Sequence, residues 1–105
     1  MRLPTSVYSQ LGPVPVALDG GIFADKKEPA FGLFCGRTRT IRVDNGSAPE
    51  IQLATLMHEV THLALFDAGA NNVLTATQAE VVSDAVGTYL AAAIIAGYLR
   101  IGAPR

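Results

Sequence analysis

Two helix-start signals in the second half of the chain, with a strong helix stop between them, restrict the possible folds more than any other feature. Both signals are capping boxes, in which a Ser or Thr caps a helix and a Glu or Gln three residues later bonds back to it. The two pairs are Ser47 with Glu50 and Thr75 with Gln78. Gly69 is a natural C-terminal stop for the first helix. The sequence therefore predicts one helix that ends near Asp67 and a second that reaches Ile95 or beyond.

The first half of the chain has the pattern of short strands separated by turn-forming residues. Three apolar stretches, 11–19, 30–35 and 38–43, are bounded by Gly, Asn and charged residues that favour turns. Within the first stretch, Pro13 and Pro15 lack the amide donor that a sheet ladder uses. This strand is therefore expected at a sheet edge or in irregular pairing.

The length of 105 residues indicates one small domain over 1–105. Strands followed by helices predict an α+β fold. In that fold, a sheet of about three strands packs on the first helix, and a second long helix that carries glutamate follows.

Composition excludes several classes of protein. Half of the residues are hydrophobic and the formal net charge is -1, so neither a disordered chain nor a basic nucleic-acid or membrane surface is expected. The apolar stretch 85–99 contains Thr88 and is shorter than the roughly 20 residues that span a membrane. Residues 1–5 lack the apolar centre of a signal peptide, so we expect a cytoplasmic protein.

Both histidines of the chain belong to one segment of the first predicted helix, His58-Glu59-Val60-Thr61-His62, which has the HExxH pattern. Residues four apart lie about 40° apart around a helix, so both imidazoles project from one face. They can then bind one tetrahedral Zn²⁺. Glu59 lies about 100° from His58 and is better placed to take a proton from a water on the metal. The segment predicts a zinc centre with Glu59 as general base.

A catalytic zinc usually has three protein ligands and one open position. Glu80 and Asp84 lie four residues apart on the second predicted helix, and therefore on one face. If this helix folds back on the first, Glu80 can be the third ligand. Asp84 can accept the hydrogen bond of a histidine ring N–H. The alternative for both carboxylates is an exposed helix face without a role in binding.

HExxH followed by a downstream ExxSD resembles the gluzincin clan, the thermolysin-like zinc peptidases. His58-Glu59-Val60-Thr61-His62 is similar to their HExTH form, and Glu80-Val81-Val82-Ser83-Asp84 keeps their Glu, Ser and Asp. The resemblance implies zinc ligands His58, His62 and Glu80, a general base and acid at Glu59, and Asp84 behind His58. It also implies the zincin-like layout of small one-domain gluzincins, in which the edge strand binds an extended substrate. Because these include phage-type metallopeptidases, a phage or prophage origin is expected.

The expected activity is hydrolysis of a peptide or protein substrate by a metal-activated water, with Glu59 moving the proton to the leaving amine. The substrate would lie along the strand 30–35 by β-addition. Larger gluzincins have an Asn just before the glutamate, where this chain has Ala79. They also carry a Tyr and a His that stabilise the oxyanion. Candidates for that task here are Tyr8, Arg37 and Arg39.

Two other functions remain open at this point. The chain can be a binding or structural protein that keeps zinc for stability, without turnover, because a metal adds stability that a small core lacks. The apolar helix over 85–99, with small residues such as Gly87 and Ala91, can pack on a partner or on a copy of itself. A homo-oligomer or a larger assembly through this helix is therefore an expectation as well.

Overall fold

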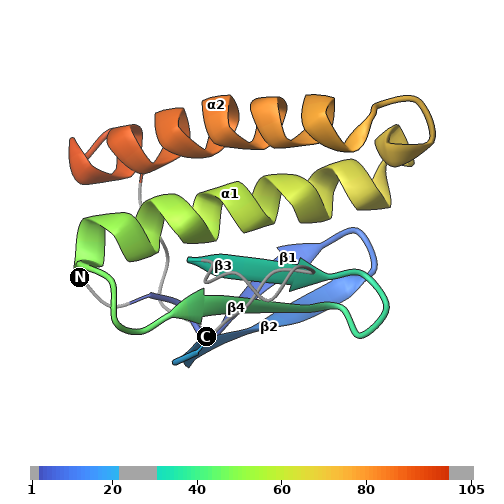
Figure 1. The fold of residues 1–105 in the computed structure, drawn as a ribbon. Helices are drawn as coiled ribbons and strands as arrows, with labels where there is room; N and C mark the ends of the chain where they lie inside the picture. Colours follow the sequence, from blue (N-terminus) through green and yellow to red (C-terminus); the bar gives the residue numbers. More distant parts are fainter. Residues whose placement is uncertain (1–2, 22–30, 100–105) are drawn as a thin grey trace.

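The computed structural model describes residues 3–21 and 31–99. The described residues form an α+β fold with a four-stranded mixed sheet and two long helices (Figure 1). The strands and helices, in chain order, are β1 (Ser6–Ser9), β2 (Gly12–Asp19), β3 (Gly32–Cys35), β4 (Thr40–Asp44), α1 (Pro49–Asp67), the 3₁₀ turn η1 (Ala70–Asn72) and α2 (Ala76–Ile95).

The elements stack in three layers, with the sheet below α1 and α2 on the far side of α1 (Figure 1). The helices are antiparallel neighbours because η1 reverses the chain within a few residues. The hydrophobic core lies between the sheet and α1. Its buried members are Val14, Ile41, Val43, Leu56 and Leu63. As the middle layer, α1 contacts the sheet with one face and α2 with the other. Residues from both the sheet and α2 can therefore lie next to its central turn.

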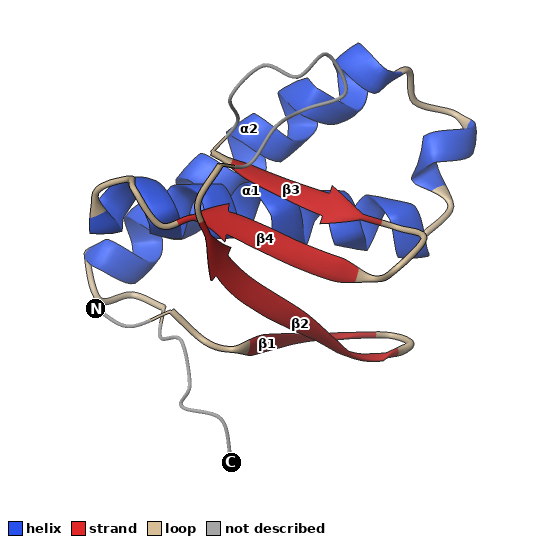
Figure 2. Cartoon of the chain, turned by 60° about the horizontal axis from the view of Figure 1, so that its bottom comes forward, coloured by secondary structure: helices blue, strands red, loops and turns tan. Residues whose placement is uncertain are grey.

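The strand order across the sheet is β1-β2-β4-β3, which leaves β3 at one edge (Figure 2). β2 pairs antiparallel with β1 along 12–15 and parallel with β4 along 16–19. Pro13 and Pro15 lie in the half that pairs only with β1, so their missing donors leave no gap in a second ladder. Each half of β2 therefore has one partner strand in regular register, so Pro13 and Pro15 lie at an edge as predicted, although β2 is inside the strand order.

The prediction of about three strands is wrong because β1 is a fourth. Its residues, Ser6–Ser9, include two serines and give little alternation of large apolar side chains. β1 forms by a tight hairpin to β2, in which Ser9 Oγ donates to the Gly12 carbonyl at 2.8 Å. Gly12 adopts a φ of 109°, which an L side chain rarely tolerates. β1 is therefore a strand because it pairs with β2 through this hairpin, and not because of its own sequence pattern.

The predicted capping box at Ser47 and Glu50 is wrong. Pro49 is the first residue of α1, and Ala48 is the N-cap with extended dihedrals and no capping side chain. Proline disfavours helical dihedrals in the residue before it, so the helix starts one residue after the position that Ser47 could cap. The Ser47 hydroxyl instead lies 3.4 Å from the Asp44 carboxylate.

The predicted start of α2 is confirmed. Thr75 Oγ1 accepts from the Gln78 amide at 3.1 Å, and Gln78 Oε1 accepts from the Thr75 amide at 2.8 Å. Gly69 follows α1 with a φ of 73°, as a C-terminal stop requires. α2 ends at Ile95, so the end of the predicted apolar stretch 85–99 is not helical. In the described part of the chain, no helix has the length and hydropathy needed to cross a membrane.

Arg39 connects three parts of the fold. Its guanidinium donates to both carboxylate oxygens of Asp67, at 2.8 and 3.0 Å, and to Ser9 Oγ at 2.8 Å. It therefore joins the β3–β4 turn to the end of α1 and to β1. Arg39 has a φ of 52°, an unfavourable conformation for a non-glycine residue that these contacts offset.

This pair predicts a loss of stability in acid. The hydrogen bond from Arg39 lowers the pKa of the Asp67 carboxyl below its ordinary value. A lowered pKa in the folded state stabilises the protein above the unfolded value, about pH 4, and this contribution disappears as the pH falls below it. The free energy of unfolding, measured with urea, should therefore differ more between the parent and Asp67→Asn at pH 6 than at pH 3. An equal difference at both pH values would contradict this.

Candidate metal centre

Close packing of α2 on α1 brings the residues of the site together. The buried side of α2 carries only small side chains: Ala79, Ser83, Gly87 and Ala91. A Cβ added at Gly87 would lie 2.7 Å from the backbone nitrogen and 2.8 Å from the Cα of His58. The glycine therefore lets the backbone of α2 touch the turn of α1 that carries the histidines, and this contact sets Glu80 and Asp84 beside them.

Three ligand atoms from the two helices converge on one point. His58 Nε2, His62 Nε2 and one oxygen of Glu80 all lie within 4.8 Å of one another. The two ring nitrogens are 3.1 Å apart, and Glu80 Oε1 is 3.3 Å from the first and 2.7 Å from the second. Two ligand atoms of one tetrahedral Zn²⁺, each about 2.05 Å from the ion, lie about 3.3 Å apart. The separations of 3.1 and 3.3 Å match this value, whereas the 2.7 Å separation is a hydrogen-bond distance, so the three ligand atoms could hold a divalent cation such as Zn²⁺ after a small shift of Glu80.

The tautomer of His58 also fits a cation at this point. Asp84 Oδ1 lies 2.8 Å from His58 Nδ1, so in the neutral ring Nδ1 carries the proton and donates it to the carboxylate. Nε2 then presents a lone pair toward Glu80 Oε1, which is an acceptor as well. Two acceptors that face each other repel unless a proton or a metal cation lies between them, and carboxylate–histidine–zinc groups use this arrangement.

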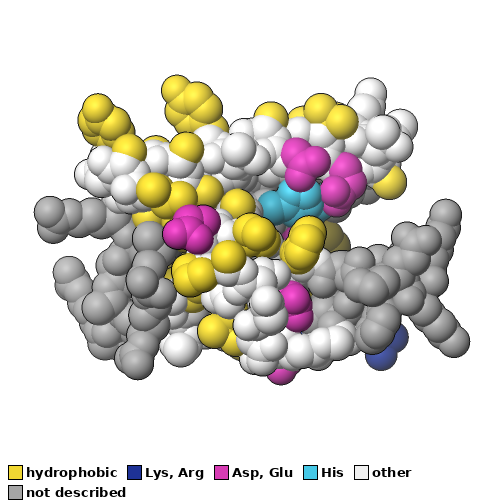
Figure 3. Space-filling view, turned by 60° about the vertical axis from the view of Figure 1, so that its left-hand side comes forward, with side chains coloured by type: hydrophobic (Ala, Val, Ile, Leu, Met, Phe, Trp, Pro, Cys, Tyr) yellow, Lys and Arg dark blue, Asp and Glu magenta, His cyan; other side chains and the backbone are white. Residues whose placement is uncertain are grey.

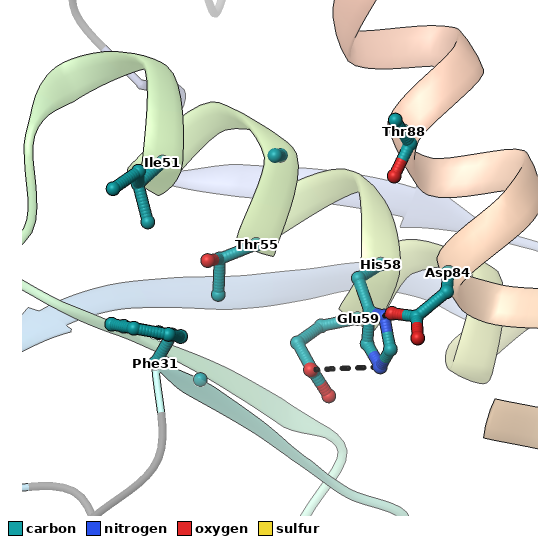
Figure 4. A pocket seen from close by; sticks show the side chains of 9 residues that line it. Phe31, Ile51, Thr55, His58, Glu59, Asp84 and Thr88 are labelled. Carbon is teal, nitrogen blue, oxygen red and sulfur yellow. Dashed lines mark ion pairs between the residues drawn. The ribbon is translucent and has the colours of Figure 1, made fainter.

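Glu59 lies next to this cluster and outside it. Its Oε2 is 3.8 Å from His58 Nε2, and the residue is buried, with 7% of its surface exposed (Figure 4). Burial raises the pKa of the Glu59 carboxyl above its ordinary value, and the nearby His58 and His62 oppose this shift without cancelling it. A carboxylate with a raised pKa takes up and returns protons more readily near neutral pH.

Glu80 is more open than its partners. Its side chain is 58% exposed, against 17% and 21% for His58 and His62. Burial acts to raise the pKa of the Glu80 carboxyl, but the hydrogen bonds and charges of His62 and His58 outweigh it and hold the pKa below the ordinary value. The carboxylate is therefore in its ligating, ionised form near neutral pH.

Two cavities meet at His58 and Glu59. The first, about 290 Å³, lies between the start of α1 and α2, with Phe31, Ile51 and Thr88 around it (Figure 4). The second, about 550 Å³, is lined by both histidines and by Glu59 and Glu80. It is completed by β3 and the turn after it, and by Phe66 and Asn71. The histidines are visible at the surface beside acidic and hydrophobic side chains (Figure 3). Among the described residues, the site therefore leaves space for a ligand along β3.

The structure brings together the five side chains that the sequence singled out: His58, Glu59, His62, Glu80 and Asp84. Sequence reasoning missed several other lining residues, among them the polar Asn71 and Thr88, because neither belongs to a recognisable pattern. It also missed Gly32, where a Cβ would collide with the Thr55 side chain and lie 3.4 Å from Glu59 Cγ. The missing side chain allows β3 to run close to α1.

Comparison of the chain with family models, with curated proteins and with solved structures gives no match in any of the three. A function can therefore be proposed only from the geometry of the site.

Proposed function

We propose that this protein is a zinc-dependent peptidase of the gluzincin type. The observation that carries the proposal is the convergence of His58 Nε2, His62 Nε2 and Glu80 Oε1 from two helices, beside a buried glutamate. Three protein ligands with an open side are the arrangement of catalytic zinc, whereas structural zinc is usually closed by four. The exposure of Glu80 and the adjoining cavities supply that open side.

Each residue of the site has a different role in the proposed hydrolysis. His58, His62 and Glu80 would hold the ion, which would supply the Lewis acidity that activates a water and polarises a carbonyl. Glu59 accepts a proton from the attacking water on its carboxylate and gives it to the leaving amine nitrogen. Asp84 keeps the His58 ring in the orientation and tautomer that expose Nε2.

A peptide is the substrate class that the cavities favour. β3 is an edge strand, and the amide of Asp44 donates to the carbonyl of Phe31 at 2.7 Å. Because antiparallel pairs alternate, the backbone groups of Gly32 and Phe34 point away from β4, toward the outer edge of the described sheet. An extended peptide can add to this edge and pass over Glu59. Phe31 lines the first cavity, and Leu33 and Phe34 line the second.

A metal-stabilised interaction protein is the second candidate. It is favoured by the large apolar side chains exposed on α2 and just after it: Val81, Val86, Tyr89, Ile95, Tyr98 and Leu99. A helix that is apolar on its outer side as well as its inner side is usually covered by another chain. This candidate keeps zinc but needs no role for Glu59.

Replacing Glu59 by Gln decides between these candidates. The amide keeps the shape of the carboxylate but cannot accept the proton, so we expect zinc content to stay at one equivalent and cleavage to fall by about 100-fold or more. Zinc is measured by metal analysis of the purified protein. Cleavage is measured by mass spectrometry of a peptide library incubated with each zinc-loaded protein.

The matched control is Glu50→Gln, which changes an exposed carboxylate in the first turn of the same helix. It should keep both zinc and full cleavage. Equal cleavage by the parent and Glu59→Gln would remove Glu59 from the mechanism. Zinc binding without any cleavage by the parent would support the interaction protein.

A further inference from the structure

We propose that the side-chain amide of Asn71 is a catalytic hydrogen-bond donor that stabilises the negative charge developing on the substrate carbonyl oxygen. This inference rests on the proposed peptidase function. Peptide hydrolysis places a full charge on that oxygen in the tetrahedral intermediate, and fixed donors aimed at it are among the strongest contributions to catalysis. The residues with assigned roles, Glu59, Asp84 and the three ligands, include no side-chain N–H donor apart from the imidazoles that would hold the metal.

Asn71 lies in the cavity that contains the three metal ligands. The 550 Å³ cavity is lined by both histidines together with Glu59 and Glu80, so a carbonyl that reacts at the metal must enter it. Among the described side chains that line this cavity, the Asn71 amide is the only N–H donor apart from the imidazoles. Asn71 also lines a neighbouring cavity of about 370 Å³ together with His62 and Glu80. It therefore stands at the boundary of the two cavities, on the Glu80 side of the site.

The amide is free for this role and its turn is held in place. Within the described residues, the Asn71 side chain makes no hydrogen bond, whereas the backbone around it does. Asn72 donates to the carbonyl of Gly69 at 3.1 Å, and Val73 and Leu74 donate to that of Ala70 at 3.0 and 2.9 Å. A short 3₁₀ turn bonded at both ends presents the amide with little loss of backbone freedom when substrate binds.

The donors that the sequence left open are placed elsewhere. Arg39 is held by Asp67 at the C-terminal end of α1 and does not line either of the two cavities that meet at Glu59. Tyr8 lines a separate cavity between β1 and α1, together with Asp67. Arg37 is exposed in the turn after β3 and lines neither of the two cavities that meet at Glu59. Of these candidate side chains, Asn71 is thus the donor best placed for the carbonyl oxygen.

The test compares Asn71→Ala and Asn71→Asp with the parent, and Asn72→Ala is the matched control from the same turn. Each protein is loaded with zinc and assayed on peptides from the library. The Asn71 variants should keep one equivalent of zinc and a similar KM, while kcat falls by about 100-fold. Asn72→Ala should match the parent, since Asn72 lines neither the 550 Å³ nor the 370 Å³ cavity.

A second measurement does not depend on turnover. A phosphinic peptide with apolar side chains carries tetrahedral oxygens where the reacting carbonyl would be, and its affinity is measured by calorimetry. Loss of a donor that acts in the transition state should weaken this binding by the same factor as kcat. In ¹⁵N-labelled parent protein, the Asn71 side-chain NH₂ signals should shift on binding.

The two failures can be told apart. If the zinc-loaded parent cleaves no peptide, the proposed function fails, and the phosphinic peptide still tests Asn71. If the parent and Asn71→Ala have the same kcat, or bind the phosphinic peptide equally well, the role of Asn71 is overturned. A lower kcat with unchanged affinity for the phosphinic peptide would also overturn it, because the amide would then not contact the charged oxygen.

Discussion

Glu80→Ala is expected to bind zinc more than about 100-fold more weakly than the parent. Loss of a partner that only orients a ligand already reduces metal affinity by about 10- to 100-fold, and removal of a direct ligand must exceed that. Glu80 Oε1 is also the only negatively charged atom among the three that converge, so its loss leaves two neutral imidazoles. Zinc affinity is measured by competition with a chromophoric chelator at neutral pH.

Asp84→Asn provides the graded comparison. It keeps an acceptor oxygen near His58 Nδ1 but removes the charge, so a loss of about 10- to 100-fold is expected. Glu50→Ala removes a carboxylate from a distant part of α1 and should leave affinity unchanged. If Glu80→Ala held zinc as tightly as the parent, the third ligand would be wrong. The proposed reaction would then lose the site on which it depends.

Gly87→Ala is expected to destabilise the protein, although alanine is the better helix former. The added Cβ would meet the backbone nitrogen and Cα of His58 at 2.7 and 2.8 Å, and neither atom can turn away as a flexible side chain would. The two helices must separate, at an expected loss of about 1–3 kcal/mol. Separation also moves Glu80 and Asp84 away from the histidines, so zinc affinity should fall with stability.

The reverse substitution, Ala85→Gly, isolates the effect of packing from that of helix propensity. Ala85 is exposed on the same helix, and glycine there should lower stability by about 1 kcal/mol with little change in zinc affinity. Urea unfolding of the metal-free proteins gives the stabilities. A Gly87→Ala protein that is more stable than the parent and binds zinc normally would show that the helices do not need this contact.

Local patterns in the sequence predicted two long helices, the end of the first and the start of the second, and five residues of the candidate site, but not the start of α1. The end of α1 at Gly69 and the start of α2 at Thr75 depend on contacts within a few residues, so the sequence predicts them directly. The spacing of His58 and His62 places both rings on one face of a helix in the same way. Glu80 and Asp84 could be inferred because a short loop forces the next helix back on the first. The resemblance to gluzincins remains a prediction.

Tertiary structure alone decided the features that depend on residues far apart in the chain. β1 exists because β2 pairs with it, Arg39 keeps its unfavourable φ because Asp67 and Ser9 bind it, and the helices touch because residue 87 has no side chain. The place of Asn71 beside the ligands depends on the path of the loop. No local pattern encodes such contacts, since each is set by packing between elements, whereas helix starts, stops and shared faces follow from dihedral angles and hydrogen bonds between near neighbours.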